Sequence, residues 1–275
     1  MNESRIERLR RLLDPLVARH QAQRPASDPF ALSRGFAHPR DRELCALLCA
    51  LYDFGPEAER HDALKRLFNR LGEKPARVLS RSNRTMLAEL AEGMAFGFLK
   101  AEDSALLLHA LRVTLRQHES LEALYQYARG EGGKRNSLAT LDRFMILIGR
   151  VLNAEERARP GLAHLLPRPA KGSPVRRLHL FLRHMVRPDD GVDTGLWSQP
   201  PASRLQVPLS SSQHRLMLAL KISTRQICNR GAVSEATRNL ALLDPQDPVR
   251  YHLAFEQLEA DGVDEAALLT LFRRA

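Results

Sequence analysis

Apolar side chains recur at helical spacing along nearly the whole chain. In residues 104–118, Leu107, Leu108, Leu111 and Leu115 recur at helical spacing, and Asp103 or Ser104 is placed to cap the first turn. The same pattern predicts further helices over residues 41–54, 137–152, 214–222, 234–243, 247–261 and 263–274. No stretch rich in β-branched residues alternates with a period of two, and aromatic residues make up only 5% of the chain. The pattern therefore predicts an all-α fold.

Four segments interrupt this helical pattern, at residues 21–39, 130–136, 159–173 and 188–208. The last of them is long for a compact domain and rich in Pro, Gly and Asp, so we expect it to be either functional or mobile. The sequence contains no internal repeat of fixed period, which argues against a solenoid. A chain of 275 residues suits one large domain or two intimate lobes.

Composition narrows the class of protein further. Hydrophobic residues make up 44% of the chain and charged residues 27%, which is typical of a soluble globular protein. No apolar run reaches the ~18–20 residues of a membrane span, and residues 1–8 hold no apolar stretch that could serve as a secretory signal. Three cysteines are too few for a disulfide framework or a four-cysteine metal site, and we expect Cys45 and Cys49 to be buried apolar residues. We therefore expect a reduced, cytoplasmic protein without membrane contact.

The chain is basic, with 42 Lys and Arg against 32 Asp and Glu and a formal net charge of +10. Such a surplus favours a polyanionic partner. Residues 157–187 contain eight cations and neither Asp nor Glu, and three histidines lie among them. This segment is either a solvated charged surface or a nucleic-acid-binding surface. Its cations are Arg157, Arg159, Arg168, Lys171, Arg176, Arg177, Arg183 and Arg187.

Residues 173–187 predict an amphipathic helix at the centre of this basic segment. The flexible Gly172 precedes a capping serine, Ser173, and a proline suited to the first turn. The free amides of such a helix start favour phosphate, and Lys171 and Arg176 would reinforce the site. The helix has an apolar face made of Leu178, Phe181, Leu182 and Met185, and a basic face made of Arg176, His179, Arg183 and Arg187.

Residues 177–187 read Arg-Leu-His-Leu-Phe-Leu-Arg-His-Met-Val-Arg, and Val-Asp-Thr-Gly-Leu-Trp follows at 192–197. This text resembles that of an uncharacterised bacterial family, a domain of unknown function. The family usually reads close to Cys-Lys-Arg-Leu-x-Met-Phe-Leu-Arg-Trp-Met-Val-Arg, with Val-Asp-x-Gly-x-Trp behind it. Residues 118–122, 207–209 and 244–251 also match, so the resemblance covers roughly residues 35–260.

The family is in turn distantly similar to the helix-hairpin-helix DNA glycosylases, particularly the archaeal 8-oxoguanine enzymes. Those are two-lobed, all-α proteins that flip a damaged base into the cleft between their lobes. In them a lysine attacks the sugar C1′ to form a Schiff base, and an aspartate some tens of residues later activates it. The resemblance implies a two-lobed domain over residues 35–262, with an N-terminal helix and linker over 1–34 and a C-terminal helix over 263–275.

Both chemical positions of the glycosylases differ in this chain. Arg176 stands at the lysine position, Ser210 at the aspartate position, and Ser212 replaces a histidine two places on. The Tyr-Asp usual near the end of the family is Tyr251-His252 here. Arginine cannot supply a free amine, and losing a carboxylate ~4 Å from a developing cation costs about 4 kcal/mol at an effective dielectric of ~20. The usual glycosylase chemistry is therefore not expected.

Two interpretations of these positions remain open. Arg176 either holds a backbone phosphate or is a surface arginine. Ser210 and Ser212 either belong to a recognition cleft or cap the helix that follows, the commoner role of such serines. His214 acts in acid–base chemistry only if a carboxylate or nucleophile lies beside it. We expect Trp197 to anchor its loop in the core rather than to stack on a base.

The hypothesis that combines these observations is a nucleic-acid-binding protein, with double-stranded DNA as its partner, that keeps a glycosylase-like fold for recognition. The alternatives are an active DNA-repair glycosylase or abasic-site lyase that uses other residues, and an all-α adaptor whose basic face meets an acidic protein. We expect neither a metal nor a cofactor. The predicted nucleic-acid-binding residues are Lys171, Gly172, Ser173, Arg176, Arg177, Arg183, Arg187, Ser210, His214 and Arg215.

Overall fold

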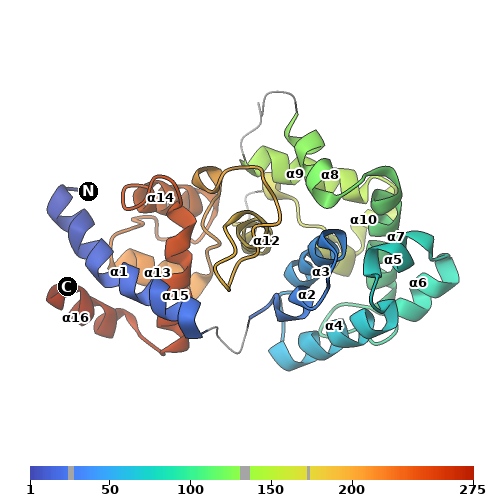
Figure 1. Ribbon diagram of the computed structural model, residues 1–275, viewed down its shortest axis with the longest axis horizontal. Coiled ribbons are helices and arrows are strands. Elements are labelled where there is room, and N and C mark those ends of the chain that lie inside the picture. Colours follow the sequence, from blue (N-terminus) through green and yellow to red (C-terminus); the bar gives the residue numbers. More distant parts are fainter. Residues whose placement is uncertain (24–27, 131–136, 172–173) are drawn as a thin grey trace. The chain divides into compact units, whose positions relative to one another are not determined.

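The computed structural model describes residues 1–23, 28–130, 137–171 and 174–275, and these residues form helices without any strand (Figure 1). This confirms the predicted all-α class. Among the helices of these ranges, none combines the length and the apolar character that crossing a bilayer requires. The chain divides into two compact units. Unit 1 contains the described residues of Met1–Ala26 and Gly172–Ala275, and unit 2 contains those of Ser27–Lys171.

Unit 2 is built around α3 (Pro39–Leu51) and α7 (Ala101–Gln117). Each residue of α3 from Glu43 to Leu51 is buried, as the unbroken apolar run in its sequence requires. The cysteines of α3 are buried and free, which confirms their predicted apolar role. The other helices of unit 2 are α2 (Ala31–Arg34), α4 (Glu57–Leu71), α5 (Pro75–Arg81), α6 (Arg84–Ala91), α8 (Leu121–Arg129), α9 (Ser137–Gly149), α10 (Ala154–Ala158), α11 (Pro160–Leu165) and the 3₁₀ turn η2 (Pro169–Lys171).

Two buried carboxylates on α3 hold neighbouring helices at their N-termini. Asp41 Oδ1 accepts the N–H of Ala76 in the first turn of α5 at 2.7 Å. Glu43 Oε1 accepts the N–H of Leu121, the first residue of α8, also at 2.7 Å. Because a helix N-terminus has unpaired amides and a partial positive charge, both contacts are stabilising. The start of α8 is therefore fixed on the central helix of unit 2.

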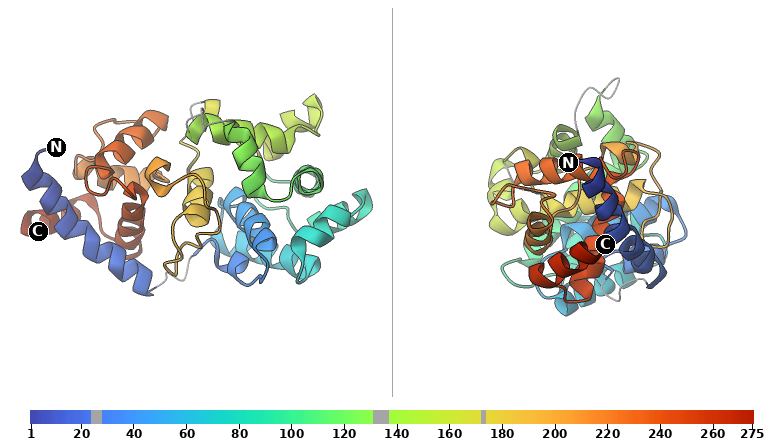
Figure 2. Two further views of the ribbon diagram at one scale, coloured as in Figure 1. Left: turned by 45° about the horizontal axis from the view of Figure 1, so that its top comes forward. Right: turned by 90° about the vertical axis from the view of Figure 1, so that its left-hand side faces the viewer.

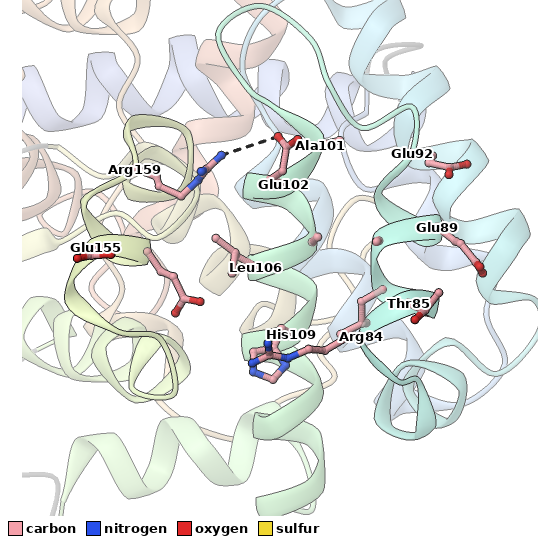
Figure 3. Close-up of a pocket in the computed structure, with 14 residues that line it drawn as sticks. Arg84, Thr85, Glu89, Glu92, Ala101, Glu102, Leu106, His109, Glu155 and Arg159 are labelled. Atoms are coloured by element: carbon pink, nitrogen blue, oxygen red, sulfur yellow. Dashed lines mark ion pairs between the residues drawn. The ribbon is translucent and has the colours of Figure 1, made fainter.

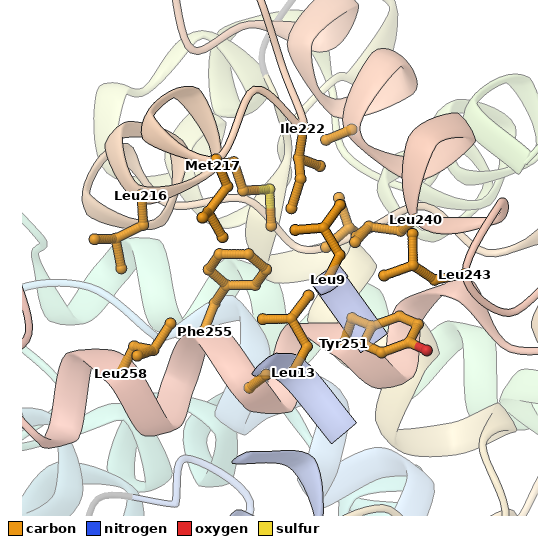
Figure 4. Close-up of a cluster of buried hydrophobic side chains, with 14 of the residues drawn as sticks. Leu9, Leu13, Leu216, Met217, Ile222, Leu240, Leu243, Tyr251, Phe255 and Leu258 are labelled. Carbon is orange, nitrogen blue, oxygen red and sulfur yellow. The ribbon is translucent and has the colours of Figure 1, made fainter. Parts of the chain in front are cut away.

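Unit 1 joins the N-terminal helix α1 (Glu3–Gln23) to the helices that follow residue 174. α1 lies along α15 and beside α16 (Figure 2). Its Leu9 and Leu13 contribute to a buried core with Leu216, Tyr251 and Phe255 (Figure 4). α1 and α16, which lie in the expected terminal segments 1–34 and 263–275, both contribute to this core. The helices are α12 (Arg176–Val186), α13 (Ser211–Ala219), α14 (Arg230–Leu240), α15 (Tyr251–Ala260) and α16 (Glu265–Arg274), with 3₁₀ turns η3 (Ala202–Arg204) and η4 (Pro248–Arg250).

α7 and α14 are among the helices that begin earlier than predicted. α7 begins at Ala101, and Asp103 accepts the Lys100 N–H at 3.1 Å from the third position of the helix. α14 begins at Arg230, because Asn229 Oδ1 accepts two backbone N–H groups of the first turn. The predicted break at 159–173 likewise contains the short helix α11.

The basic helix begins later than predicted. α12 begins at Arg176 rather than at residue 173, and the residue before it, Val175, has a left-handed φ of 41°. Pro174 therefore precedes the helix and does not lie in its first turn. The glycine and serine expected to form the phosphate-binding start of the helix, Gly172 and Ser173, lie outside the described residues.

The long segment at residues 188–208 is held on unit 1 by its apolar side chains. Trp197 is 3% exposed and packs edge-on against Phe181 of α12, with ring centroids 5.2 Å apart. Its backbone N–H donates to the Met185 carbonyl at 2.8 Å. Val192 and Val207 also join the core of unit 1. The predicted role of Trp197 as an anchor is confirmed.

Candidate functional site

The helix expected to present a basic face is buried on nearly every side. His179, Arg183 and His184 of α12 are as deeply buried as its apolar residues, with exposures of 2% or less. The apolar face predicted from the sequence is correct, but the opposite face packs inside unit 1 as well. The basic face of α12 therefore does not line an open groove.

Arg183 and Arg187 are occupied by carboxylates within unit 1. Arg183 Nε lies 3.2 Å from Asp193 Oδ1, and its Nη1 donates to Glu256 Oε2 at 2.7 Å. Arg187 pairs with the other oxygen of Asp193, and its Nε donates to Asp247 Oδ2 at 2.8 Å. With both side chains at most 4% exposed, the expectation that they contact phosphates does not hold. We call these residues, together with Asp190 at 2.9 Å from Arg187, the buried ion cluster.

The basic segment is free of acids in sequence but not in space. Arg159 Nε donates to Asp103 Oδ1 at 2.5 Å, and Arg168 Nε donates to Asp142 Oδ1 at 3.0 Å. Both acids come from helices of unit 2 that lie far away along the chain. Together with the buried ion cluster, these pairs neutralise half of the eight cations that suggested a continuous phosphate-binding surface. The side chain of Lys171 lies outside the described residues.

Asp193 is the centre of the buried ion cluster. Burial alone raises the pKa of a carboxyl, but Arg183, His184 and Arg187 outweigh it and hold the pKa of Asp193 far below its ordinary value. Burial likewise opposes the charge of Glu256, and Arg183 again reverses that effect and lowers its pKa. Both carboxylates are therefore charged in the folded protein.

His252 connects this cluster to α13. Its Nε2 lies 3.1 Å from Gln213 Oε1, and its Nδ1 contacts Arg183 and lies 3.5 Å from Glu256 Oε2. Burial lowers the pKa of His252 against the opposing carboxylate of Glu256, and Arg183 and Arg176 lower it further. A neutral His252 that donates from Nε2 and accepts at Nδ1 satisfies both contacts.

Two of the predicted site residues, Arg176 and Ser210, are connected to His252 indirectly. Arg176 is near enough to lower the pKa of His252, and Ser210 caps the helix whose Gln213 bonds that histidine. Glu259 of α15 also approaches, 3.4 Å from the hydroxyl of Ser210. A carboxylate of α15 therefore lies beside the hydroxyl of Ser210.

Ser210 has the capping role that its position predicts. Its hydroxyl accepts the N–H of Gln213 at 3.1 Å, while Gln213 Oε1 accepts the N–H of Ser210 at 3.3 Å. This reciprocal pair is a capping box and confirms the capping interpretation. Ser212 donates to Glu259, a contact between α13 and α15.

The remaining predicted residues on α13 are His214, which is buried, and Arg215, which is exposed beside carboxylates. His214 is 3% exposed, and its Nε2 has no hydrogen-bond partner within the described residues. Arg215 is exposed and donates to Glu265 Oε1 at 2.9 Å. A hollow of about 350 Å³ beside Arg215 is lined by Glu259, Asp264 and Glu265. Three carboxylates against one arginine repel phosphate, so this face of unit 1 does not suit a nucleic-acid backbone.

A cap and a ligand-binding residue respond differently to substitution. In the Ser210→Ala variant, unit 1 should lose about 1 kcal/mol of its free energy of unfolding, because one N–H of the first turn of α13 loses its acceptor. Urea unfolding followed by fluorescence measures this loss in unit 1, which contains the chain's one tryptophan. The matched variant Ser211→Ala, at an exposed neighbour, should change stability by less than about 0.5 kcal/mol. Equal losses in the two variants would contradict the capping role.

A partly exposed basic and aromatic face on α8, α9 and the end of α7 was not predicted from the sequence. Tyr127 is 57% exposed, with the guanidinium carbon of Arg143 5.8 Å from its ring centroid and the ring of His118 6.2 Å away. Arg150 donates to Gln117 and, after burial, is the cause that lowers the pKa of His118. We call Gln117, His118, Tyr127, Arg143, Ile146 and Arg150 the α8–α9 face.

A signal for this face was present in the sequence. Arg143, Ile146 and Arg150 fall at i, i+3 and i+7, which places them on one side of α9. The apolar stripe of α9 accounts for its buried side and leaves this side unassigned. Ile146 is 42% exposed between the two arginines, so the side is solvent-facing as well as basic.

A sequence model of a family described as "Protein of unknown function (DUF2400)" matches residues 28–261. The match spans most of the chain and confirms the predicted resemblance to an uncharacterised family. No curated protein and no solved structure matches the chain. None of these comparisons links the chain to the DNA glycosylases.

Proposed function

Since the chain belongs to the DUF2400 family of proteins of unknown function, we propose that it is a DNA-binding protein whose contact surface is the α8–α9 face. The observation that carries the proposal is the exposed Tyr127 with a guanidinium over its ring. Arginines bind backbone phosphates, and an exposed aromatic ring stacks on an unpaired or flipped base. The face combines both groups on two packed helices.

The charge balance of the chain supports the same conclusion. The buried ion cluster holds two arginines and four carboxylates, a formal charge of −2 with the histidines neutral. Because the whole chain carries +10, the residues outside the cluster carry +12. The ion pairs that remove Arg183 and Arg187 from the interface therefore leave the rest of the chain more basic. A polyanion is the partner that this surplus favours.

The residue at the glycosylases' lysine position, Arg176, favours DNA binding without cleavage of the glycosidic bond. Arg176 remains protonated and cannot attack a sugar carbon to form an imine. Glu259 beside Ser210 is the one observation that favours the alternative, a DNA-repair glycosylase or lyase with a displaced carboxylate. Borohydride trapping on a duplex with an abasic site separates the two: a covalent adduct would require an amine nucleophile and would establish the alternative.

Duplex binding at two salt concentrations tests the proposal. For the two phosphate contacts that Arg143 and Arg150 can make, the affinity of a fluorescently labelled 20-base-pair duplex should fall about twelve-fold between 50 and 200 mM salt. The double variant Arg143→Glu/Arg150→Glu should bind at least about ten-fold more weakly, with a salt slope smaller by about two. Fluorescence anisotropy measures both quantities, and circular dichroism checks that the helix content is kept.

The matched control is Arg77→Glu/Arg81→Glu on α5, which makes the same change in charge at two other exposed arginines of unit 2. Its affinity should stay within about three-fold of the parent, since it removes no direct phosphate contact. Tyr127→Ala should weaken binding to a single strand by about 1–3 kcal/mol and binding to a fully paired duplex by less. Absence of binding by the parent, or equal losses in the two double variants, would refute the proposal.

A further inference from the structure

A groove of about 820 Å³ opens in unit 2 between α6, α7 and α10 (Figure 3). Its volume is within the range of about 300–1,000 Å³ typical of ligand sites. It is a feature of unit 2 alone, and none of its lining residues belongs to the α8–α9 face. Its properties are therefore independent of the proposed DNA binding.

The floor of the groove is apolar and made largely of small residues. Leu87 and Ala88 come from α6, and Ala101, Ala105 and Leu106 come from α7. Leu106 and Ala105 are half-buried, and Ala88 is exposed. Because alanines leave the backbones of α6 and α7 accessible, another element can approach to the short end of helix–helix distances, about 8 Å between axes.

The rim of the groove is acidic on both sides. Glu89 and Glu92 lie on the side of α6, and Glu155 and Glu156 lie on the side of α10 (Figure 3). With Glu102 the lining contains five carboxylates against two arginines, a formal charge of −3 with histidine neutral. This sign is opposite to that of the chain as a whole, which carries +10.

Part of the positive charge in the groove is already neutralised. Arg159 Nε donates to the buried Asp103 at 2.5 Å, and its Nη2 lies 3.8 Å from Glu102 (Figure 3). At the opposite end Arg84 lies by His109 (Figure 3) and lowers the pKa of that histidine after burial and Arg112. The lining of the groove between these ends therefore keeps a net negative charge.

From this juxtaposition we infer that the groove binds a basic amphipathic helix of a partner protein. Apolar side chains of that helix would rest on the alanine and leucine floor, and Lys or Arg on its two flanks would meet the glutamates of α6 and α10. Two acidic rims on either side of an apolar seam match the pattern by which charged flanking positions select a partner helix. A nucleic-acid backbone is excluded from this surface by the same carboxylates.

The length of the floor favours a helix over a compact cation. The lining residues of α7 run from Ala101 to His109, which is about 12 Å of helix axis and slightly more than two turns. Over two turns a docked helix presents apolar residues at i, i+3, i+4 and i+7. The groove is open along this length, so an extended occupant fits it without a rearrangement.

Peptide binding to the full chain tests this inference. The probe is a labelled 18-residue peptide of leucine and lysine with leucines at i, i+3, i+4 and i+7, and the control peptide has the same composition with leucines around the whole helix. We expect the amphipathic peptide to bind with a Kd on the order of 10 µM and the control peptide at least about ten-fold more weakly. Anisotropy measures both affinities.

Variants of the groove locate the binding. Ala105→Gln, which fills the floor without a change in charge, and Glu155→Lys, which reverses the α10 rim, should each weaken the amphipathic peptide at least about ten-fold. Glu73→Lys makes the same change in charge at an exposed residue outside the groove and should leave the affinity within about two-fold. Circular dichroism verifies the fold of each variant.

Three results would overturn the inference. Equal binding of the two peptides would show that the groove attracts positive charge but does not select a helix with one apolar face. Binding of spermine at the same site without binding of the peptide would identify a small organic cation as the occupant. No binding of either peptide would show that the groove is not an interface. Because DNA binding uses other residues, its outcome leaves each of these results unchanged.

Discussion

In the Asp193→Ala variant, unit 1 should lose about 3–5 kcal/mol of its free energy of unfolding at pH 7. Asp193 is 1% exposed and pairs with both Arg183 and Arg187. Its removal leaves two buried guanidinium groups with less compensation, and an uncompensated buried charge is strongly destabilising. Urea unfolding followed by the fluorescence of Trp197 measures the loss, because this residue packs on the helix that carries both arginines.

The matched control for this prediction is Asp189→Ala, which removes the same charge four residues earlier. Asp189 is exposed, and its carboxylate accepts only a long hydrogen bond from the Gly191 N–H, at 3.3 Å. We expect its stability to change by less than about 0.5 kcal/mol. A loss in Asp193→Ala no larger than that of Asp189→Ala would show that the buried ion cluster contributes nothing to stability. It would also reopen the assignment of Arg183 and Arg187 to an external ligand.

Acidification should destabilise unit 1 through His179. Burial lowers the pKa of His179 to about 4, and its Nδ1 has no hydrogen-bond partner within the described residues. Between pH 6.5, the pKa of His179 in the unfolded chain, and about pH 4, its pKa in the folded chain, His179 binds a proton in the unfolded chain but not in the folded one. Stability is therefore complete above pH 6.5 and falls by about 3 kcal/mol by pH 4.

The His179→Leu variant should lose this component of the pH dependence. We expect its free energy of unfolding at pH 7 to equal or exceed that of the parent, because the variant no longer buries an unpaired nitrogen. A smaller slope should remain in the variant, since burial also lowers the pKa of His20 and His252. Urea unfolding at pH 7, 6, 5 and 4.5 measures the slopes, and identical slopes in the parent and the variant would contradict the role of His179.

The helical fold could be predicted because burial of an apolar stripe depends on neighbours three and four residues away. The start of α7 was missed because Asp103, a predicted cap, is the third residue of the helix and accepts the N–H of Lys100. The start of α14 was missed because its cap, Asn229, lies outside the apolar stripe that defines the helix. The membership of α1 in unit 1 could not be predicted. An amphipathic helix shows in its sequence that one face is covered, but not which distant segment covers it.

The ion pairs of the candidate site could not be predicted from the sequence either. The absence of acids between residues 157 and 187 is a fact about sequence neighbours, whereas ion pairs are made by neighbours in space. Arg183 meets Glu256, and Arg159 meets Asp103, across 73 and 56 residues of chain. A cation within a run of cations is therefore not an exposed cation. The basic part of the α8–α9 face, by contrast, could have been predicted, because Arg143 and Arg150 are seven residues apart on one helix.

The discontinuity of unit 1 has a consequence for its synthesis on the ribosome. α1 emerges before unit 2, and α15, against which α1 packs, follows more than two hundred residues later. At about 5–20 residues per second, the nascent N-terminal helix waits for roughly ten to fifty seconds before its partner exists. Unit 2 is contiguous and needs no such delay. Translation thus leaves the leucines of α1 uncovered while unit 2 assembles, and this interval is when the growing chain most needs a chaperone.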